Sequence, residues 1–192
     1  MPDNNTPGLD ATNLQQTQAY DLIANTNKSF FLTGKAGTGK TTFLSNVQKL
    51  IDKQFIVLAP TGIAAITAHG VTTHSFFGFD FNVQTPDTKR KRYNGIKLNT
   101  IRSCDTFIID EVSMVRCDII DQIDRTLRDV MNNKLPFGGK QMVFVGDMFQ
   151  LPPVLKSGPE RDAMKAHYDT DAPLFFKANV FKRLKLPTIE FV

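Results

Sequence analysis

A glycine-rich stretch between two apolar segments constrains this chain more than any other feature. It reads Gly34-Lys35-Ala36-Gly37-Thr38-Gly39-Lys40-Thr41 and fits the phosphate-loop pattern GxxxxGK[ST]. The apolar run 30–32 before it has the composition of a buried strand, and residues 43–51 after it carry apolar side chains at helical spacing. Strand, loop and helix in this order form the context in which the pattern binds a nucleoside triphosphate.

The loop predicts a role for each of its residues. Glycines let backbone N–H groups curl around phosphate oxygens, and the start of the following helix adds its positive dipole. Lys40 is expected to reach the β- and γ-phosphates, and the Thr41 hydroxyl is expected to hold Mg²⁺. The predicted cofactors are therefore ATP or GTP together with Mg²⁺. The residues expected to bind the nucleotide are Gly34, Ala36, Gly37, Thr38, Gly39, Lys40, Thr41 and Thr42.

Composition places the chain among ordinary globular proteins. Its 192 residues are 41% hydrophobic and 22% charged, which is enough for one packed domain. No apolar run approaches the length of a membrane span and no signal peptide is visible, so we expect an intracellular protein without a membrane partner. Cys104 and Cys117, the two cysteines, predict half-buried free thiols rather than a disulfide or a zinc site.

A modest positive charge permits nucleic-acid binding without establishing it. The net charge is +4, and the basic residues concentrate in the run Lys89-Arg90-Lys91-Arg92. Two interpretations of this run are open: a solvated loop, or a contact with a phosphate backbone that acts without sequence preference. The three histidines lack the spacing of metal ligands.

Apolar runs alternate with amphipathic ones along the chain. Helices are predicted after the cap residues Asn13 and Thr61, after the phosphate loop, and over residues 119–131, with a short helix near 175–184. This alternation implies parallel strands joined by right-handed crossovers, an α/β fold with helices on both faces of a sheet. The predicted strands are residues 30–32, 55–59, 106–109, 142–145 and 189–192.

Three segments lack a regular pattern. Residues 1–12 are polar and contain two prolines, so a disordered leader is expected. Residues 70–99 are irregular, which is typical of a functional or disordered segment, and a polar loop is expected after residue 154. Four phenylalanines in the irregular segment are expected to be mostly core residues: Phe76, Phe77, Phe79 and Phe81.

Two neighbouring predicted strands end in acidic residues. Asp110 and Glu111 follow the strand 106–109, and the carboxyl ends of parallel strands face the ligand crevice. We assign Asp110 to the metal ion and Glu111 to general-base catalysis. Asp147 follows the next strand, and Gln150 is a candidate for orienting water at the γ-phosphate. The alternative for Gln150 is an incidental place in a turn ended by prolines.

Five sequence blocks follow one another along the chain: the phosphate loop, Ala59–Ala65, Gly70–Phe77, Asp110–Val115 and Gly146–Val154. Together they resemble the PIF (petite integration frequency) family of superfamily 1B DNA helicases, and the resemblance covers roughly residues 9 to 192. It implies a RecA-like P-loop NTPase with a mainly parallel central sheet flanked by helices. It also implies an ATP-driven motor that moves 5′→3′ on single-stranded DNA and unwinds duplexes and G-quadruplexes. Roles in DNA repair, DNA recombination and telomere maintenance are expected with it.

The resemblance carries roles to matching residues. It implies that Gln150 links the γ-phosphate to DNA. It also implies that Lys40 contacts phosphate, that Thr41 and Asp110 hold Mg²⁺, and that Glu111 is the general base. The family also reads adenine through a glutamine upstream of the loop. Of the three candidates Gln15, Gln16 and Gln18, Gln16 fits best. The implied contacts with single-stranded DNA are Pro60, Thr61, Gly62, His74, Ser75 and Phe76.

One departure from the family concerns the second half of the motor. Such helicases hydrolyse ATP between two RecA-like domains, and the second domain supplies arginines that stabilise the transferring phosphoryl group. In the family the first of these arginines follows a strand like 188–192, where this chain ends. Residues 13–192 are therefore expected to be the first RecA-like domain alone. Residues after Val154 form either a small wedge appendage within 154–180 or a crossover connection.

We expect the chain to be a monomer that binds Mg·ATP and single-stranded DNA weakly and hydrolyses ATP poorly. Two alternatives remain open. One is a non-catalytic module that binds nucleotide or DNA through inherited motifs, and the other is a P-loop ATPase without an unwinding role.

Overall fold

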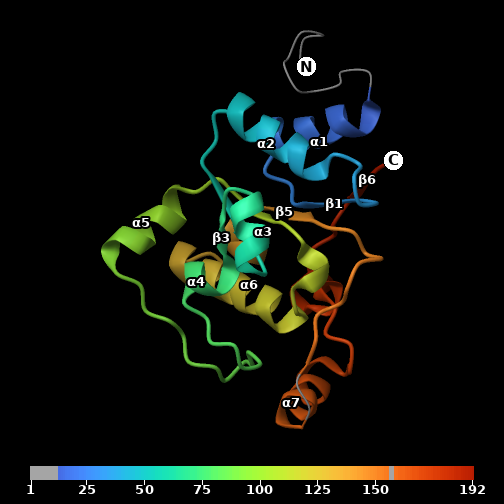
Figure 1. The fold of residues 1–192 in the computed structure, drawn as a ribbon. Coiled ribbons are helices and arrows are strands. Elements are labelled where there is room, and N and C mark those ends of the chain that lie inside the picture. Colours follow the sequence, from blue (N-terminus) through green and yellow to red (C-terminus); the bar gives the residue numbers. More distant parts are fainter. Residues whose placement is uncertain (1–12, 156–157) are drawn as a thin grey trace.

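The strands of this protein form one parallel sheet. The computed structural model describes residues 13–155 and 158–192, and within them the strand order is β3-β2-β4-β5-β1-β6 (Figure 1). Every pairing in the sheet is parallel, so all carboxyl ends lie along the same edge. The strands are β1 (Phe30–Gly34), β2 (Phe55–Ala59), β3 (Val71–Thr72), β4 (Thr106–Ile109), β5 (Gln141–Val145) and β6 (Thr188–Phe191).

Helices cover both faces of the sheet. α1 and α2 lie together on one side, and α6 lies on the other (Figure 1). None of the described helices is long and apolar enough to cross a lipid bilayer. The α-helices are α1 (Leu14–Asn25), α2 (Lys40–Leu50), α3 (Gly62–Thr67), α4 (Thr73–Phe77), α5 (Gly95–Ser103), α6 (Cys117–Met131) and α7 (Pro159–Tyr168). Short 3-10 turns are η1 (Val112–Met114), η2 (Pro136–Gly139), η3 (Phe175–Lys177) and η4 (Asn179–Lys182).

Two apolar cores follow from the alternation of side chains along the strands. Phe30 and Leu32 of β1 point to the core beneath α1 and α2, whereas Phe31 points to the core beneath α6. All residues of β4 and β5 are buried, because helices cover both of their faces. After their first residues, Thr106 and Gln141, these two central strands are therefore continuous apolar runs in the sequence.

The structure confirms the five predicted strands and both predicted helix caps. The side chain of Asn13 accepts a hydrogen bond from the backbone N–H of Gln16 (3.0 Å), and Thr61 caps α3 through Ala64 (3.2 Å). Both cysteines are free, as predicted, and fully rather than half buried. The proposed leader, residues 1–12, lies outside the described residues.

Other expectations of secondary structure are wrong. The segment 70–99 holds β3, α4 and the start of α5, the region after residue 154 holds α7, and the helix expected near 175–184 is two 3-10 turns. Each of α5 and α7 buries a single side chain, Ile101 or Met164. Helices this short depend on tertiary packing more than on an apolar stripe, so their sequences carry little periodic signal.

One helix anchors three loops through the carboxylates of two buried aspartates and one half-buried aspartate. Asp118, Asp121 and Asp124 lie on α6, and each accepts backbone N–H bonds from a distant segment. Asp124 accepts the N–H of Phe137 at 2.6 Å and also binds Arg128 and Arg183. Protein donors around a buried carboxylate replace the hydrogen bonds that the carboxylate would otherwise make with water.

This arrangement predicts that replacing either of two aspartates of α6 lowers the free energy of unfolding by a different amount. Asp124→Ala leaves the buried N–H of Phe137 without its acceptor, so the free energy of unfolding should fall by about 1–3 kcal/mol. Asp129→Ala removes only a pair with Arg90, whose side chain is 70% exposed, and should cost less than about 1 kcal/mol. Urea unfolding of both variants measures the difference. Equal losses would contradict the anchoring role of Asp124.

Candidate functional site

The phosphate loop has a backbone that favours glycine at three positions. Gly37 and Gly39 both have a φ of +83°, in the left-handed region. Gly34 has a φ of +145°, and a Cβ there would lie 2.5 Å from the carbonyl oxygen of Phe191 in β6. α2 begins at Lys40 without a side-chain cap, so its first N–H groups remain available to phosphate oxygens.

Side chains within the loop tie it together. The Nζ atom of Lys40 donates to the carbonyl oxygens of Gly34 (2.6 Å) and Lys35 (2.9 Å). The Thr38 hydroxyl donates to the Lys35 carbonyl at 2.9 Å. The loop therefore holds the Lys40 ammonium against its own backbone, where the predicted phosphate contacts would form.

Two strands deliver carboxylates to the same edge of the sheet. Asp110 follows β4 and is 6% exposed, and Asp147 follows β5 and is 7% exposed. Asp110 and Thr41 line one cavity of about 250 Å³ between α2 and α3. Mg²⁺ prefers oxygen ligands and usually keeps waters and substrate phosphates beside one or two protein groups. The hydroxyl and the carboxylate thus fit such an ion.

No cluster of three or more metal-ligating residues occurs in the segments 13–155 and 158–192. In nucleotide-binding proteins Mg²⁺ usually takes most of its ligands from phosphate oxygens and water.

The environment of the two adjacent acids disfavours their ionised forms. Burial raises the pKa of Asp110, against the opposing effects of the Glu111 N–H bond (3.0 Å) and the Lys40 charge. Burial also raises the pKa of Glu111, and the charges of Asp110 and Asp147 act in the same direction. Glu111 adopts a left-handed backbone with a φ of +51°, which is uncommon for a residue with a side chain. A raised pKa moves a carboxylate towards the range of an effective general base.

The two predicted glutamines occupy different elements. Gln150 is exposed in the loop after β5, where its N–H donates to the Asp147 carbonyl at 3.2 Å. Gln16 lies half-buried in the first turn of α1, which packs against β6.

Three of the six predicted DNA contacts are exposed at the same edge of the sheet. Thr61 and Gly62 are exposed after β2, behind the half-buried Pro60. Ser75 is exposed on α4, and the neighbouring His74 is half-buried. These residues follow β2 and β3, on the opposite side of β4 from the phosphate loop.

Among the phenylalanines at positions 76–81, the exposed one is not the predicted one. Phe76 is 9% exposed and packs against Phe77 and Phe107, so its ring belongs to the core rather than to a DNA surface. Phe81, expected in the core, is instead 74% exposed and stacks on His74. The polar neighbours of Phe81 on both sides, Asp80 and Asn82, are the one sequence signal that could have indicated this exposure.

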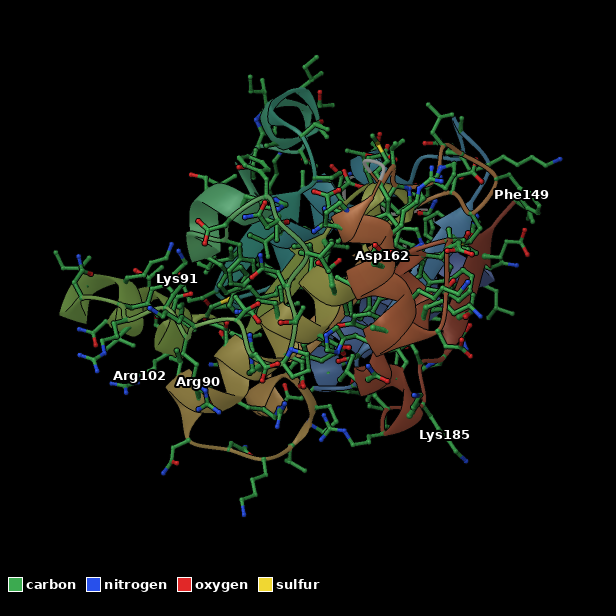
Figure 2. The ribbon with its side chains drawn as sticks, turned by 90° about the horizontal axis from the view of Figure 1, so that it is seen from below. Arg90, Lys91, Arg102, Phe149, Asp162 and Lys185 are labelled. Carbon is green, nitrogen blue, oxygen red and sulfur yellow. The ribbon has the colours of Figure 1, made fainter. Side chains whose placement is uncertain are left out.

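The basic run 89–92 is partly neutralised by acidic partners. Arg90 pairs with Asp129 at 2.8 Å, and Lys91 pairs with Asp80 at 3.3 Å. Figure 2 shows Arg90 and Lys91 on the opposite side of the molecule from Phe149, which lies in the loop of Gln150. The run is therefore remote from this loop, and its phosphate contact stays a prediction.

Comparison with known proteins agrees with this geometry. The family model of PIF1-like helicases matches residues 11–183. Bacteroides Pif1 bound to single-stranded DNA is 46% identical and superimposes with a TM-score of 0.86 over 93% of this chain and 41% of that chain. Bacteroides Pif1 with ADP-AlF3 and single-stranded DNA is 45% identical, with a TM-score of 0.88 over 94% of this chain and 42% of that chain.

Curated relatives give the same result. The helicase PIF1 of Emericella nidulans is 38% identical over 78% of this chain and 21% of its own length. The helicase RRM3 of Saccharomyces cerevisiae is 35% identical over 82% of this chain and 23% of its own length. The chain therefore belongs to the PIF1-like helicase family and has the RecA-like fold of the Pif1 motor. It spans about a fifth of the curated relatives and two fifths of the solved chains.

The burial of Asp110 at the end of β4 predicts that its ionised side chain lowers the stability of the fold at neutral pH. Because burial raises the folded pKa of Asp110, its contribution to stability is full below the unfolded pKa and is lost as pH rises through the folded pKa. Asp110→Asn should therefore raise the melting temperature at neutral pH in Mg²⁺-free buffer. This gain should shrink as pH falls through the titration of Asp110.

Thermal unfolding of both proteins from about pH 4 to pH 8 tests this prediction. Asp52→Asn, which removes an exposed acid, serves as the control. A gain in melting temperature that is independent of pH would contradict the account of Asp110.

Proposed function

We propose that this chain is the N-terminal, ATP-binding motor domain of a 5′→3′ DNA helicase. The observation that carries the proposal is the shared cavity of Thr41 and Asp110, next to the phosphate loop. The charge of Lys40 in this loop also acts on Asp110. A phosphate loop, a basic side chain and a carboxylate thus lie at one edge of a parallel sheet, where ligands of such sheets bind. Relatives named as ATP-dependent DNA helicases support the activity.

Each residue of the site has a proposed part in ATP binding and hydrolysis. Lys40 would release the loop carbonyls and contact the β- and γ-phosphates, and Thr41 and Asp110 would hold Mg²⁺. Mg²⁺, when bound, neutralises charge that develops on the phosphate oxygens. Glu111 would accept the proton of the attacking water, helped by its raised pKa. Gln150 would orient that water.

Single-stranded DNA is the proposed partner at the neighbouring turns. The solved relatives bound to single-stranded DNA support this partner. Hydroxyl groups and N–H groups of loops are suited to phosphate contacts, which position DNA without reading its sequence. Thr61, Gly62 and Ser75 offer such groups. Duplex and G-quadruplex substrates, together with the direction of movement, stay predictions for the whole protein. The proposed DNA contacts are Pro60, Thr61, Gly62, His74 and Ser75.

We further propose that this domain supplies one side of the ATP site. The solved relatives are more than twice as long as the matched region, which leaves room for a second RecA-like domain in such proteins. In motors of this kind an arginine from the opposite side is worth roughly 10³–10⁵ in rate. The 192-residue chain alone should therefore bind nucleotide but hydrolyse it poorly.

A first prediction concerns nucleotide affinity. Lys40→Ala should weaken binding of a fluorescent ATP analogue with Mg²⁺ by about 10- to 150-fold, the cost of a lost hydrogen bond to a charged group. Lys35→Ala is the matched control, because it removes the same charge from an exposed position of the same loop. Equilibrium titration gives both affinities. Unchanged affinity in Lys40→Ala would exclude this loop as the nucleotide site.

A second prediction concerns turnover. Steady-state ATP hydrolysis by the 192-residue chain should be negligible both with and without single-stranded oligothymidine. Glu111→Gln provides the background, because it removes the proposed base while keeping the shape of the side chain. Turnover accelerated by DNA would show that the chain completes its own site. Turnover independent of DNA would instead indicate a P-loop ATPase without a DNA motor role.

A further inference from the structure

A small cavity lies at the carboxyl edge of the sheet, apart from the phosphate loop. Its volume is about 150 Å³, well below the roughly 300–1,000 Å³ of pockets for drug-sized ligands. A space of this size suits one planar ring rather than a whole nucleotide. It is here called the Phe81 pocket, and its wall includes Pro60, His74, Phe81, Met114, Pro153 and Val154.

An exposed aromatic pair forms one wall of the Phe81 pocket. The rings of His74 and Phe81 stack with centroids 4.8 Å apart and planes inclined by 17°. Phe81 nevertheless stays 74% exposed, whereas Phe76, Phe77 and Phe79 in the same segment are at most 9% exposed. The fold thus buries three of these rings and presents the fourth at a pocket. Burial and the charge of Arg116 lower the pKa of His74, which favours a neutral ring.

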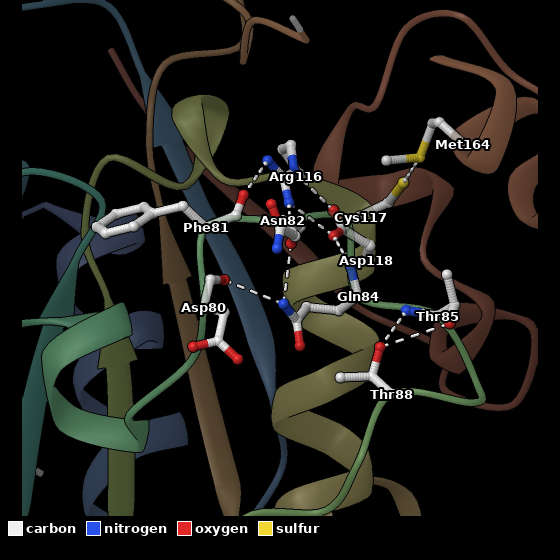
Figure 3. Close-up of polar contacts among 10 residues, drawn as sticks. All are labelled: Asp80, Phe81, Asn82, Gln84, Thr85, Thr88, Arg116, Cys117, Asp118 and Met164. Carbon is white, nitrogen blue, oxygen red and sulfur yellow. Dashed lines mark hydrogen bonds and ion pairs between the residues drawn. The ribbon is translucent and has the colours of Figure 1, made fainter. Parts of the chain in front are cut away.

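Hydrogen bonds from Arg116 hold the loop that carries Phe81 (Figure 3). Arg116 donates to the carbonyl oxygens of Phe81 (3.3 Å) and Asn82 (3.1 Å). Its guanidinium also forms a two-pronged pair with the fully buried Asp118, at 2.9 and 2.8 Å. Asp118 in turn accepts the backbone N–H of Gln84 at 2.7 Å.

A second side chain reinforces the same loop. The amide of Gln84 donates to the carbonyl oxygens of Asp80 (3.0 Å) and Asn82 (2.9 Å), on either side of Phe81. A buried ion pair is weak evidence for stability, because desolvation offsets much of its attraction. Here the pair fixes a loop whose apolar ring faces solvent, which is an arrangement expected of a preorganised binding surface.

We propose that the Phe81 pocket receives one unpaired base of single-stranded DNA, which stacks on the Phe81–His74 pair, and that Arg116 is a positioning residue for this platform. The inference rests on the proposed DNA motor function and adds a base-binding position to it. Every base has an aromatic face, so stacking tolerates any sequence, as a translocating motor requires. Pro153 and Val154 of the pocket belong to the loop that also carries Gln150, so a docked base would touch the loop of the ATP site.

The test compares two single-stranded probes that carry the same number of phosphates. One is a fluorescent oligothymidine of about 10 nucleotides, and the other is an abasic oligonucleotide of equal length. Phosphate contacts are common to both, so a difference in affinity isolates the bases. Phe81→Ala in the 192-residue chain should weaken oligothymidine binding by about 5- to 150-fold and leave abasic binding unchanged. Phe81→Tyr should retain the affinity of the unsubstituted chain.

Two further variants complete the experiment. Leu135→Ala removes an apolar side chain that is 61% exposed and outside the Phe81 pocket, and it should change neither affinity. Arg116→Lys keeps the charge but loses the planar fork, so it should reduce the preference for thymidine over abasic DNA. A thermal melt of each variant confirms that the fold is retained at the assay temperature.

The outcomes separate this inference from the proposed function. Equal weakening of both probes by Phe81→Ala, or weakening of neither, would overturn base docking while DNA binding stands. Equal affinity of the unsubstituted chain for both probes would also overturn base docking while DNA binding stands. A chain that binds the ATP analogue but neither probe would overturn the DNA function and the inference together. An unchanged thymidine preference in Arg116→Lys would remove the positioning role alone.

Discussion

Parallel pairing of the three central strands is the constraint on which the rest of the site depends. In the register of the sheet, Ile109 of β4 pairs with Phe144 of β5, and Phe144 pairs with Phe31 of β1. The strands therefore end at nearly the same level. The phosphate loop, the acids after β4 and Asp147 after β5 meet there although more than 100 residues separate the first from the last. No local interaction between these segments would bring them together.

The site is formed at some expense to the stability of the fold. Burial disfavours ionisation of Asp110 and Glu111, the charge of Asp110 adds to this at Glu111, and Glu111 adopts a left-handed backbone. Buried acids and backbone strain both oppose folding, and they concentrate at functional positions. Burial of the apolar cores on both faces of the sheet offsets these unfavourable contributions to the free energy of folding.

α6 fixes the positions of several loops away from the phosphate loop. Its aspartates bind backbone N–H groups from the segments at residues 84, 137 and 179–180, so loops remote in sequence become fixed to one helix. Through Arg116 this anchoring extends to Phe81, at the edge that also carries the proposed DNA contacts. The long connection after α4 is therefore held by polar contacts rather than by regular secondary structure.

The sequence by itself determined the parts of this protein that local pattern encodes. The phosphate loop, the fully buried strands and the acids that follow β4 and β5 were all predictable, because a glycine motif or an apolar run is visible within a few residues. Tertiary structure decided which of the phenylalanines at positions 76–81 faces solvent, and polar neighbours are only a weak sequence signal of it. Phe76 and Phe81 have the same side chain, yet one packs on Phe107 while the other stacks on His74. The helices α5 and α7, which each bury one side chain, also depend on distant packing partners that no sequence window contains.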